Sequence, residues 1–391
     1  MSLVLVVAIP FSGGSAEASG PDAARLLETI NSVGPDGAGV IEAGRALRQL
    51  TAAGPAVLPD VLAAIDRANP RAANYLRAAA ETIADRALAA GQELPAGRLL
   101  AFVEDRRHDP RARRLAFELL RRVDNAAAER LVPSLLTDPS GELRREAVQR
   151  KIELAEGLMK LHALADGPQR AAISELATGA YRAALTGAVD DDQVKAIVGP
   201  LRKLGHPVDL REHFGFITEW QVIGPFDHRG GIGLDAVYPP EREIDFGAEY
   251  DGQLGRVRWQ PISTGHEYGI VDIAKQLENY KGSCMYLAAE FHSPERRNVQ
   301  VRLGTPNSWK LWLNGRFLFG REEYHRGMKL DQYPVEVELQ AGRNVILFKI
   351  CQNEQDEDWA QRYEFQLRVC DPSGAAVRSQ PPGQVGGGGG R

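Results

Sequence analysis

The chain has 391 residues, of which 43% are hydrophobic and 25% charged, enough to bury the cores of two or three domains. Its formal net charge is -5, and the arginines between residues 106 and 160 alternate with acidic residues, which predicts a solvated helical face of mixed sign. Phosphate binding needs an unopposed basic surface, so these features argue against nucleic acid as a partner.

The first 18 residues resemble a secretory signal peptide. An apolar run from Leu3 to Phe11 is followed by small residues and by Ala16-Glu17-Ala18, after which cleavage is expected. The basic residues that usually precede such a run are missing. The run is too short to span a bilayer, and no later segment resembles a transmembrane helix. We therefore expect an exported protein, periplasmic, cell-surface or extracellular, without a transmembrane segment.

Residues 20–212 are rich in Ala, Leu, Arg and Glu, and their apolar residues recur at helical spacing. Within residues 38–156, three stretches share one pattern: a short apolar helix, then Asn69-Pro70, Asp109-Pro110 or Asp138-Pro139, then a second amphipathic helix. Asn or Asp caps a following helix, and Pro suits its first turn. The pattern resembles HEAT-type repeats, whose helix pairs stack into a solenoid and whose surfaces bind protein partners. Plain helical hairpins without a repeat register are the alternative.

From residue 213 onward, tryptophans appear for the first time, and alternating or continuous apolar runs replace the helical pattern. We place the joint between the two regions at residues 206–213. The expected strands are ITEWQVIG, MYLAAEFHS, NVQVRLG, WKLWLNG, RFLFG, VEVEL, NVILFKIC and EFQLRVC. Many short strands separated by turns predict an antiparallel β-sandwich. The fold class is therefore an α-helical solenoid followed by a β-sandwich over residues 213–375, with a disordered Gly-rich tail over residues 376–391.

The succession of motifs in the β-region resembles the galactose-binding-like jelly roll. The segments LWLNG at residues 311–315 and LQAGRNVILFK at residues 339–349 carry the resemblance. Such domains accompany many extracellular enzymes as carbohydrate-binding or accessory modules, so the resemblance implies a glycan or polysaccharide ligand. Many domains of this fold only pack against neighbours. A structural adaptor that binds no sugar is therefore the second interpretation, and an accessory part of an extracellular hydrolase system is the third.

Two tryptophans three positions apart raise a specific question. Trp309 shares one strand face with leucines and is expected in the sandwich core. Lys310, Trp312 and Asn314 share the other face, and an aromatic ring between a cation and an amide has the composition of a sugar-binding platform. The alternative is that the helical half, or a loop, covers the Trp312 ring.

A second candidate ligand site is the loop that contains Tyr324, His325 and Arg326, with an ordinary solvated loop as the alternative. The acidic loop at residues 354–358 offers oxygen ligands for calcium but lacks the spacing of a dedicated calcium loop, so we expect no cofactor.

The sequence contains no nucleophile elbow, no H-E-x-x-H motif and no P-loop, and its histidines are scattered. We therefore expect neither a metal site nor an enzyme.

The three cysteines are Cys284, Cys351 and Cys370, and none forms a C-x-x-C pair. In the strands that contain Cys284 and Cys370, the alternating apolar residues face the core and leave both thiols on the outer face. A disulfide between these two is the expectation for an exported chain, and three buried inert thiols are the alternative.

Overall fold

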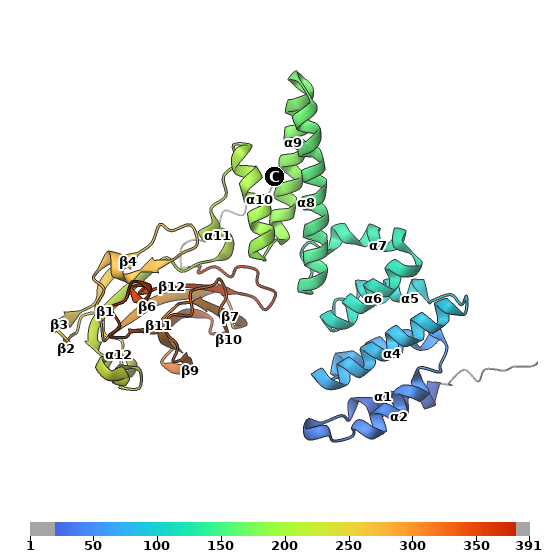
Figure 1. Ribbon diagram of the computed structural model, residues 1–391, viewed down its shortest axis with the longest axis horizontal. Coiled ribbons are helices and arrows are strands. Elements are labelled where there is room, and N and C mark those ends of the chain that lie inside the picture. The colour runs from blue at the N-terminus through green and yellow to red at the C-terminus, as the bar shows by residue number, and fades with distance from the viewer. Residues whose placement is uncertain (1–19, 381–391) are drawn as a thin grey trace, which may run out of the picture. The chain divides into compact units, whose positions relative to one another are not determined.

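The computed structural model describes residues 20–380, in which the helices precede the strands as expected (Figure 1). The signal-like segment 1–18 lies outside these residues. The chain divides into two compact units, Met1–Glu153 and Leu154–Arg391. The change from helix to strand occurs just after the joint expected at residues 206–213, whereas the division between the units falls much earlier. No helix among the described residues combines the length and apolar character needed to cross a membrane.

The first unit consists of helices joined by short turns, several of them 3-10 helical. Consecutive helices pair, and each pair contacts the next (Figure 1). One apolar core, which includes Leu62, Leu76 and Leu120, runs through the stack. The helices are α1 (Gly20–Asn31), α2 (Val40–Leu50), α3 (Leu58–Ala64), α4 (Pro70–Ala89), α5 (Ala96–Glu104), α6 (Pro110–Val123), α7 (Asn125–Leu131) and α8 (Gly141–Leu164), the last of which crosses the division between the units.

The three Asn/Asp-Pro motifs do not all act alike. Asn69 and Asp109 cap α4 and α6, and each side chain accepts hydrogen bonds from N–H groups of the first turn. Asp138 instead lies fully buried, and its carboxylate binds the Arg113 guanidinium at 2.6 and 2.8 Å. Arg113 is therefore not part of the solvated face that was expected for this segment, because its charge is matched inside the core.

The second unit begins with the C-terminal part of α8 and continues with α9 (Gly167–Gly187), α10 (Asp191–Lys203) and α11 (Leu210–Phe214). The side chain of Asp191, at the start of α10, accepts a 2.9 Å hydrogen bond from the Tyr268 hydroxyl of the β-region. Arg202 on the same helix pairs with the neighbouring Glu267. These contacts explain why the helices after residue 153 belong to the same compact unit as the strands.

The β-region is a sandwich of a six-stranded sheet, ordered β4-β1-β6-β11-β8-β9, and a four-stranded sheet, ordered β10-β7-β12-β5, with antiparallel pairing throughout (Figure 1). All eight expected strands are present. The strands of the two sheets are β1 (Glu219–Asp227), β4 (Gln260–Ser263), β5 (Val271–Asp272), β6 (Ser283–Ser293), β7 (Arg297–Gly304), β8 (Ser308–Leu313), β9 (Arg316–Arg321), β10 (Tyr333–Leu339), β11 (Gly342–Gln352) and β12 (Glu364–Cys370).

The sandwich core lies between the two sheets and contains the residues assigned to it by alternation. Trp309 is fully buried there, together with side chains such as Leu287 and Phe365. The turn after β8 is a tight hairpin, in which Asn314 and Gly315 adopt positive φ angles of 53° and 77°.

One segment between β1 and β4, residues 228–259, is here called the insert. It contains η5 (Arg229–Leu234), α12 (Pro239–Arg242) and a small hairpin of β2 (Glu249–Gly252) and β3 (Gly255–Arg258). It covers part of the outer face of the six-stranded sheet and forms a second apolar cluster with it. The sheet residues in this cluster are Ile223, Phe226, Cys284, Tyr286, Ala288, Trp312, Leu347 and Cys351.

Lys349 on β11 anchors the insert. Its ammonium group is fully buried and lies 3.0 and 2.8 Å from the carbonyl oxygens of Leu234 and Ala236, and 2.8 Å from a carboxylate oxygen of Glu241. All three acceptors belong to the insert. The ammonium also lies over the ring of Tyr286, 5.3 Å from its centroid, which adds a cation–π contact. Protein groups of the insert and the sheet therefore replace the water that would otherwise surround this buried charge.

The structure corrects two expectations: the start of the C-terminal tail and the disulfide between Cys284 and Cys370. The tail does not begin at residue 376: the Val377 N–H donates to the Val369 carbonyl oxygen at 2.9 Å, and the Val377 side chain joins the sandwich core. The disulfide between Cys284 and Cys370 is also wrong, because β6 and β12 belong to different sheets. All three cysteines are free and buried.

Candidate functional site

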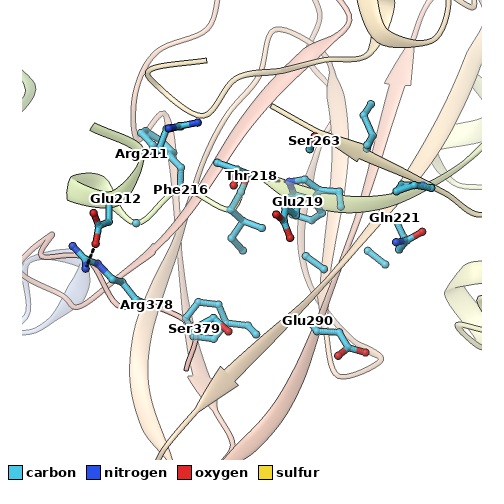
Figure 2. Close-up of a pocket in the computed structure, with 18 of the residues that line it drawn as sticks. Arg211, Glu212, Phe216, Thr218, Glu219, Gln221, Ser263, Glu290, Arg378 and Ser379 are labelled. Carbon is cyan, nitrogen blue, oxygen red and sulfur yellow. Dashed lines mark hydrogen bonds and ion pairs between the residues drawn. The ribbon is translucent and has the colours of Figure 1, made fainter. Parts of the chain in front are cut away.

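The part of the outer sheet face that the insert leaves uncovered forms a groove of about 1340 Å³, here called the outer-face groove (Figure 2). Its floor comes from β1, β4 and β6, and its walls come from α11, the segment 215–218, the segment 377–379 and one residue of the insert. The residues that carry its chemistry are Glu219 and Gln221 on β1, Ser263 on β4, Glu290 on β6, Phe246 from the insert, and Arg211, Glu212 and Arg378 on the walls.

The floor of the groove is polar because alternate residues of each strand face outward. Figure 2 shows Glu219, Gln221 and Glu290 on these strands. Glu290 accepts a 2.8 Å hydrogen bond from Nε of Arg343 on β11, and Nη2 of the same guanidinium forms an ion pair with it at 2.7 Å. This charge-assisted contact lowers the pKa of Glu290 below its usual range, so the carboxyl group is ionised at neutral pH.

The arginines in the wall are already matched by acids. Arg378 pairs with Glu212 at 2.7 Å (Figure 2), and Arg211 pairs with Asp209 at 2.8 Å. Among the described residues, Glu219 has no ion-pair partner and no side-chain hydrogen bond. The groove therefore carries a surplus of negative charge.

The groove also has an aromatic side. Phe246 of the insert is 39% exposed, and its ring meets the buried Trp259 edge to face at 5.3 Å. Phe216 and Ile217 also line the groove. Apolar rings beside outward-facing amide and carboxylate groups are the usual composition of a pocket for a polar organic ligand.

The first predicted site, around Trp312, is largely covered. The ring is 6% exposed because the insert lies over it, so the loop cover stated as an alternative is what is found. Asn314 uses its amide within the fold, accepting from the Val345 N–H at 2.8 Å and donating to Asn344 at 3.0 Å. Lys310 pairs with Asp235 of the insert at 2.7 Å. A small hollow of about 360 Å³ still borders Trp312 and Asn314.

The second predicted site lies on loops at one end of the sandwich. The Tyr324 hydroxyl is 2.6 Å from Nε2 of the buried His228, and burial raises the pKa of Tyr324. His325 meets the ring of Trp359 edge to face at 4.7 Å, and Trp359 is 58% exposed. Arg326 points elsewhere, toward Glu323 at 3.6 Å. The rings of Tyr324 and His325 lie 5.9 Å apart, whereas the exposed Arg326 side chain pairs with Glu323.

The acidic loop at residues 354–358 borders a shallow hollow next to these aromatic residues. The Glu354 carboxylate accepts a 2.8 Å hydrogen bond from the Gly230 N–H, so it holds a neighbouring loop. Within residues 20–380, no group of three or more His, Cys, Asp or Glu side chains is arranged to hold a metal ion.

Sequence reasoning missed the residues of the outer-face groove. Glu219, Gln221 and Glu290 lie in predicted strands, but nothing in the sequence brings them together. Phe246 lies in the insert, for which no structure was predicted. The alternation of apolar and polar residues in β1 and β6 shows which side chains face outward. It does not show that the two strands are neighbours, which is known only from the sheet order in the structure.

No model of a known protein family matches the sequence, and no curated protein matches it. Similar solved structures include the β-glucosidase from Kluyveromyces marxianus in complex with glucose, 9% identical over 39% of this chain and 16% of that chain, with a TM-score of 0.25. A β-glucuronidase from an uncultured Clostridium sp. is 13% identical over 40% of this chain and 28% of its own, with a TM-score of 0.24. The β-glucuronidase of Faecalibacterium prausnitzii is 16% identical over 35% and 20%, with a TM-score of 0.20. This chain spans less than a third of each of them, and likenesses this weak carry no argument about its activity or ligand.

Proposed function

We propose that the protein is a non-catalytic binding protein whose outer-face groove holds a glycan. The observation that carries the proposal is the combination of an exposed aromatic ring, Phe246, with the outward polar groups of Glu219, Gln221 and Glu290 in one groove. Sugar rings present CH groups on one face and hydroxyls at their edges, so they match an aromatic wall beside a polar floor. The jelly-roll resemblance agrees with this ligand class.

A binding role accounts for the carboxylates better than glycoside hydrolysis does. Hydrolysis of a glycosidic bond requires one carboxyl group that stays protonated and acts as the general acid. Arg343 lowers the pKa of Glu290, which opposes that role. The carboxylates of Glu219 and Glu290 also project from strands on the same face of the sheet, where they are suited to accept hydrogen bonds from hydroxyl groups.

The charge of the groove favours a neutral or amino-bearing glycan over an acidic one. Each wall arginine is paired, and Glu219 is an unpaired acid among the described residues, so an anionic uronate or sulfate group meets net repulsion. A neutral polysaccharide avoids this cost and still satisfies the polar floor.

The proposal is tested by affinity electrophoresis of the full chain in gels that contain one soluble polysaccharide each. We expect a neutral polysaccharide to retard the protein and a polyuronate to leave its mobility unchanged. Phe246→Ala should weaken retardation about tenfold, which corresponds to about 1.4 kcal/mol. Leu254→Ala, at a 72% exposed position outside the groove, is the matched control and should bind as the wild type does.

Trp359→Ala separates the groove from the loop site near Tyr324 and His325. Loss of retardation in Trp359→Ala together with full retention in Phe246→Ala would place the ligand on the loops and contradict the groove. Retardation by none of a broad set of polysaccharides would favour the adaptor interpretation instead.

The adaptor interpretation has its own support in the helical hairpin of α8 and α9. Leu161, Leu164 and Leu176 are 55%, 83% and 61% exposed there, and exposed leucines of this kind mark a contact surface. A photo-crosslinking residue placed at position 164 in cells should give an adduct with a second protein, whereas the same residue at position 254 should not. A hydrolase captured in this way would establish the accessory role in a hydrolase system.

Export is the remaining part of the proposal, and it rests on the first 18 residues of the sequence. We expect the mature protein outside the cytoplasm to begin at Ser19. Cell fractionation followed by N-terminal sequencing tests this, and a cytoplasmic protein that retains Leu3 to Phe11 would contradict it.

A further inference from the structure

The pairing of β6 with β11 brings two cysteines together that are far apart in the sequence. Cys351 lies directly opposite Cys284 in the antiparallel register, flanked by the pairs Gln352↔Ser283 and Ile350↔Met285. Residues directly opposite one another in an antiparallel pair have Cα atoms about 4.5 to 5.5 Å apart. A disulfide needs a Cα separation of about 4.4 to 6.8 Å, so this pair meets the requirement without movement of the backbone.

The two side chains also point the same way. Both belong to the apolar cluster on the outer face of the sheet, beneath the insert, and both are fully buried. The pKa of the Cys351 thiol is raised by burial and by its hydrogen bond with the Cys284 sulfur. The Cys284 Sγ lies 4.0 Å from the Gly233 carbonyl oxygen of the insert. The insert therefore shields the pair from reagents in the folded protein.

The third cysteine is excluded from this chemistry. Cys370 lies on β12 of the other sheet, opposite Gln300, and its Sγ lies 3.8 Å from the Gln300 carbonyl oxygen. Face-to-face sheets are about 10 Å apart, well beyond the reach of a disulfide. Of the three cysteines, Cys284 and Cys351 are therefore close enough to be linked, and Cys370 has no cysteine within reach.

We propose that Cys284 and Cys351 form a cross-strand disulfide when the chain folds in an oxidising medium that supplies a low-molecular-weight disulfide. One protein thiolate attacks that disulfide, which gives a mixed disulfide and releases one small thiol. The second protein thiolate then attacks the mixed disulfide and releases the other small thiol. Two protein S–H bonds are lost and one S–S bond is formed, while the oxidant is reduced to two thiols. The link joins two central strands of the six-stranded sheet directly beneath the insert.

The test is refolding of the full chain from urea in a mixture of reduced and oxidised glutathione. Remaining thiols are alkylated in denaturant, and the digested protein is analysed by mass spectrometry without reduction. We expect one alkylated residue, Cys370, and one linked peptide pair that contains Cys284 and Cys351 and has lost about 2 Da, the mass of two hydrogen atoms. Alkylation of all three cysteines, or a link that includes Cys370, would overturn the proposal.

Two variants control for failure to fold. Cys370→Ser should keep the linked pair, and Cys351→Ala should abolish it while it keeps the buried position apolar. Circular dichroism verifies that each variant is folded before its thiols are counted. A link in folded Cys351→Ala would show that Cys284 has another partner and would also overturn the proposal. In the wild type, the oxidised form should unfold at a higher urea concentration than the reduced form.

Discussion

At the scale of single residues, Trp309 and Trp312 show what strand alternation does and does not determine. Their opposite faces follow from the period of a strand, as predicted. The cover over Trp312 does not, because it comes from the insert, which lies far away in the sequence. Alternation therefore identified the two faces correctly but could not tell a binding platform from a second buried cluster.

The first prediction concerns these two rings. Trp309→Ala should destabilise the β-region by about 3 to 5 kcal/mol, because it removes a large fully buried aromatic ring from the sandwich core. Urea unfolding followed by circular dichroism measures this loss. Trp312→Ala should in addition make the insert sensitive to protease, with cleavage between residues 228 and 259. Resistance of the insert in that variant would show that Trp312 does not hold it.

His228 predicts how stability depends on pH. The pKa of its imidazole is lowered by burial and by the nearby Lys349 ammonium, and its Nδ1 atom has no hydrogen-bond partner among the described residues. The unfolded chain takes up a proton near pH 6.5, whereas the folded protein does so only at lower pH. Stability should therefore fall as the pH decreases below about 6.5, until the lowered folded pKa is reached.

The measurement is the urea midpoint between pH 7.5 and pH 5 for the wild type and for His228→Gln. Since the variant has no titrating group at this position, its midpoint should fall less over that range. A variant curve that runs parallel to the wild-type curve would show that His228 is not responsible for the slope.

At the scale of elements, the insert depends on one buried charge. Lys349→Met should destabilise the protein by about 3 to 5 kcal/mol, because the Glu241 carboxylate and two carbonyl groups lose their cation in a buried setting. Lys310 provides the matched control: it lies opposite Lys349 on β8, but its partner Asp235 is 90% exposed. Lys310→Met should therefore cost less than about 1 kcal/mol. Chemical denaturation measures both, and equal losses would contradict the anchoring role.

The eight predicted strands and the unpredicted insert differ in length and in hydrophobic pattern, and this difference decides which elements can be predicted from the sequence. Strands such as β6 and β11 are long and contain continuous or alternating apolar residues, so their period is readable. The strands β2, β3 and β4 have four residues each, too few for a period to emerge. The nearly continuous apolar run from Val345 to Cys351 is a local sign that both faces of this strand are covered.

At the scale of the whole molecule, the compact unit 154–391 predicts that helices after residue 153 stabilise the sandwich. A fragment of residues 154–380 should unfold at a higher urea concentration than a fragment of residues 214–380, because the second lacks the Asp191 contact with Tyr268 and the Arg202 contact with Glu267. All five tryptophans lie between residues 220 and 359, so their fluorescence reports on the sandwich in both fragments. Equal midpoints would show that the helices do not contribute.

The insert has a consequence for the order of events during synthesis on the ribosome. Residues 228–259 leave the ribosome before β6, β8 and β11, which supply most of the surface that they cover. Ile223 and Phe226 of β1 are already translated, but until Cys351 has been translated and β11 has paired, the apolar side chains of the insert lack much of their native packing surface. The nascent chain therefore carries an exposed apolar segment for the time needed to translate roughly a hundred further residues, several seconds at bacterial or eukaryotic rates of about 5 to 20 residues per second.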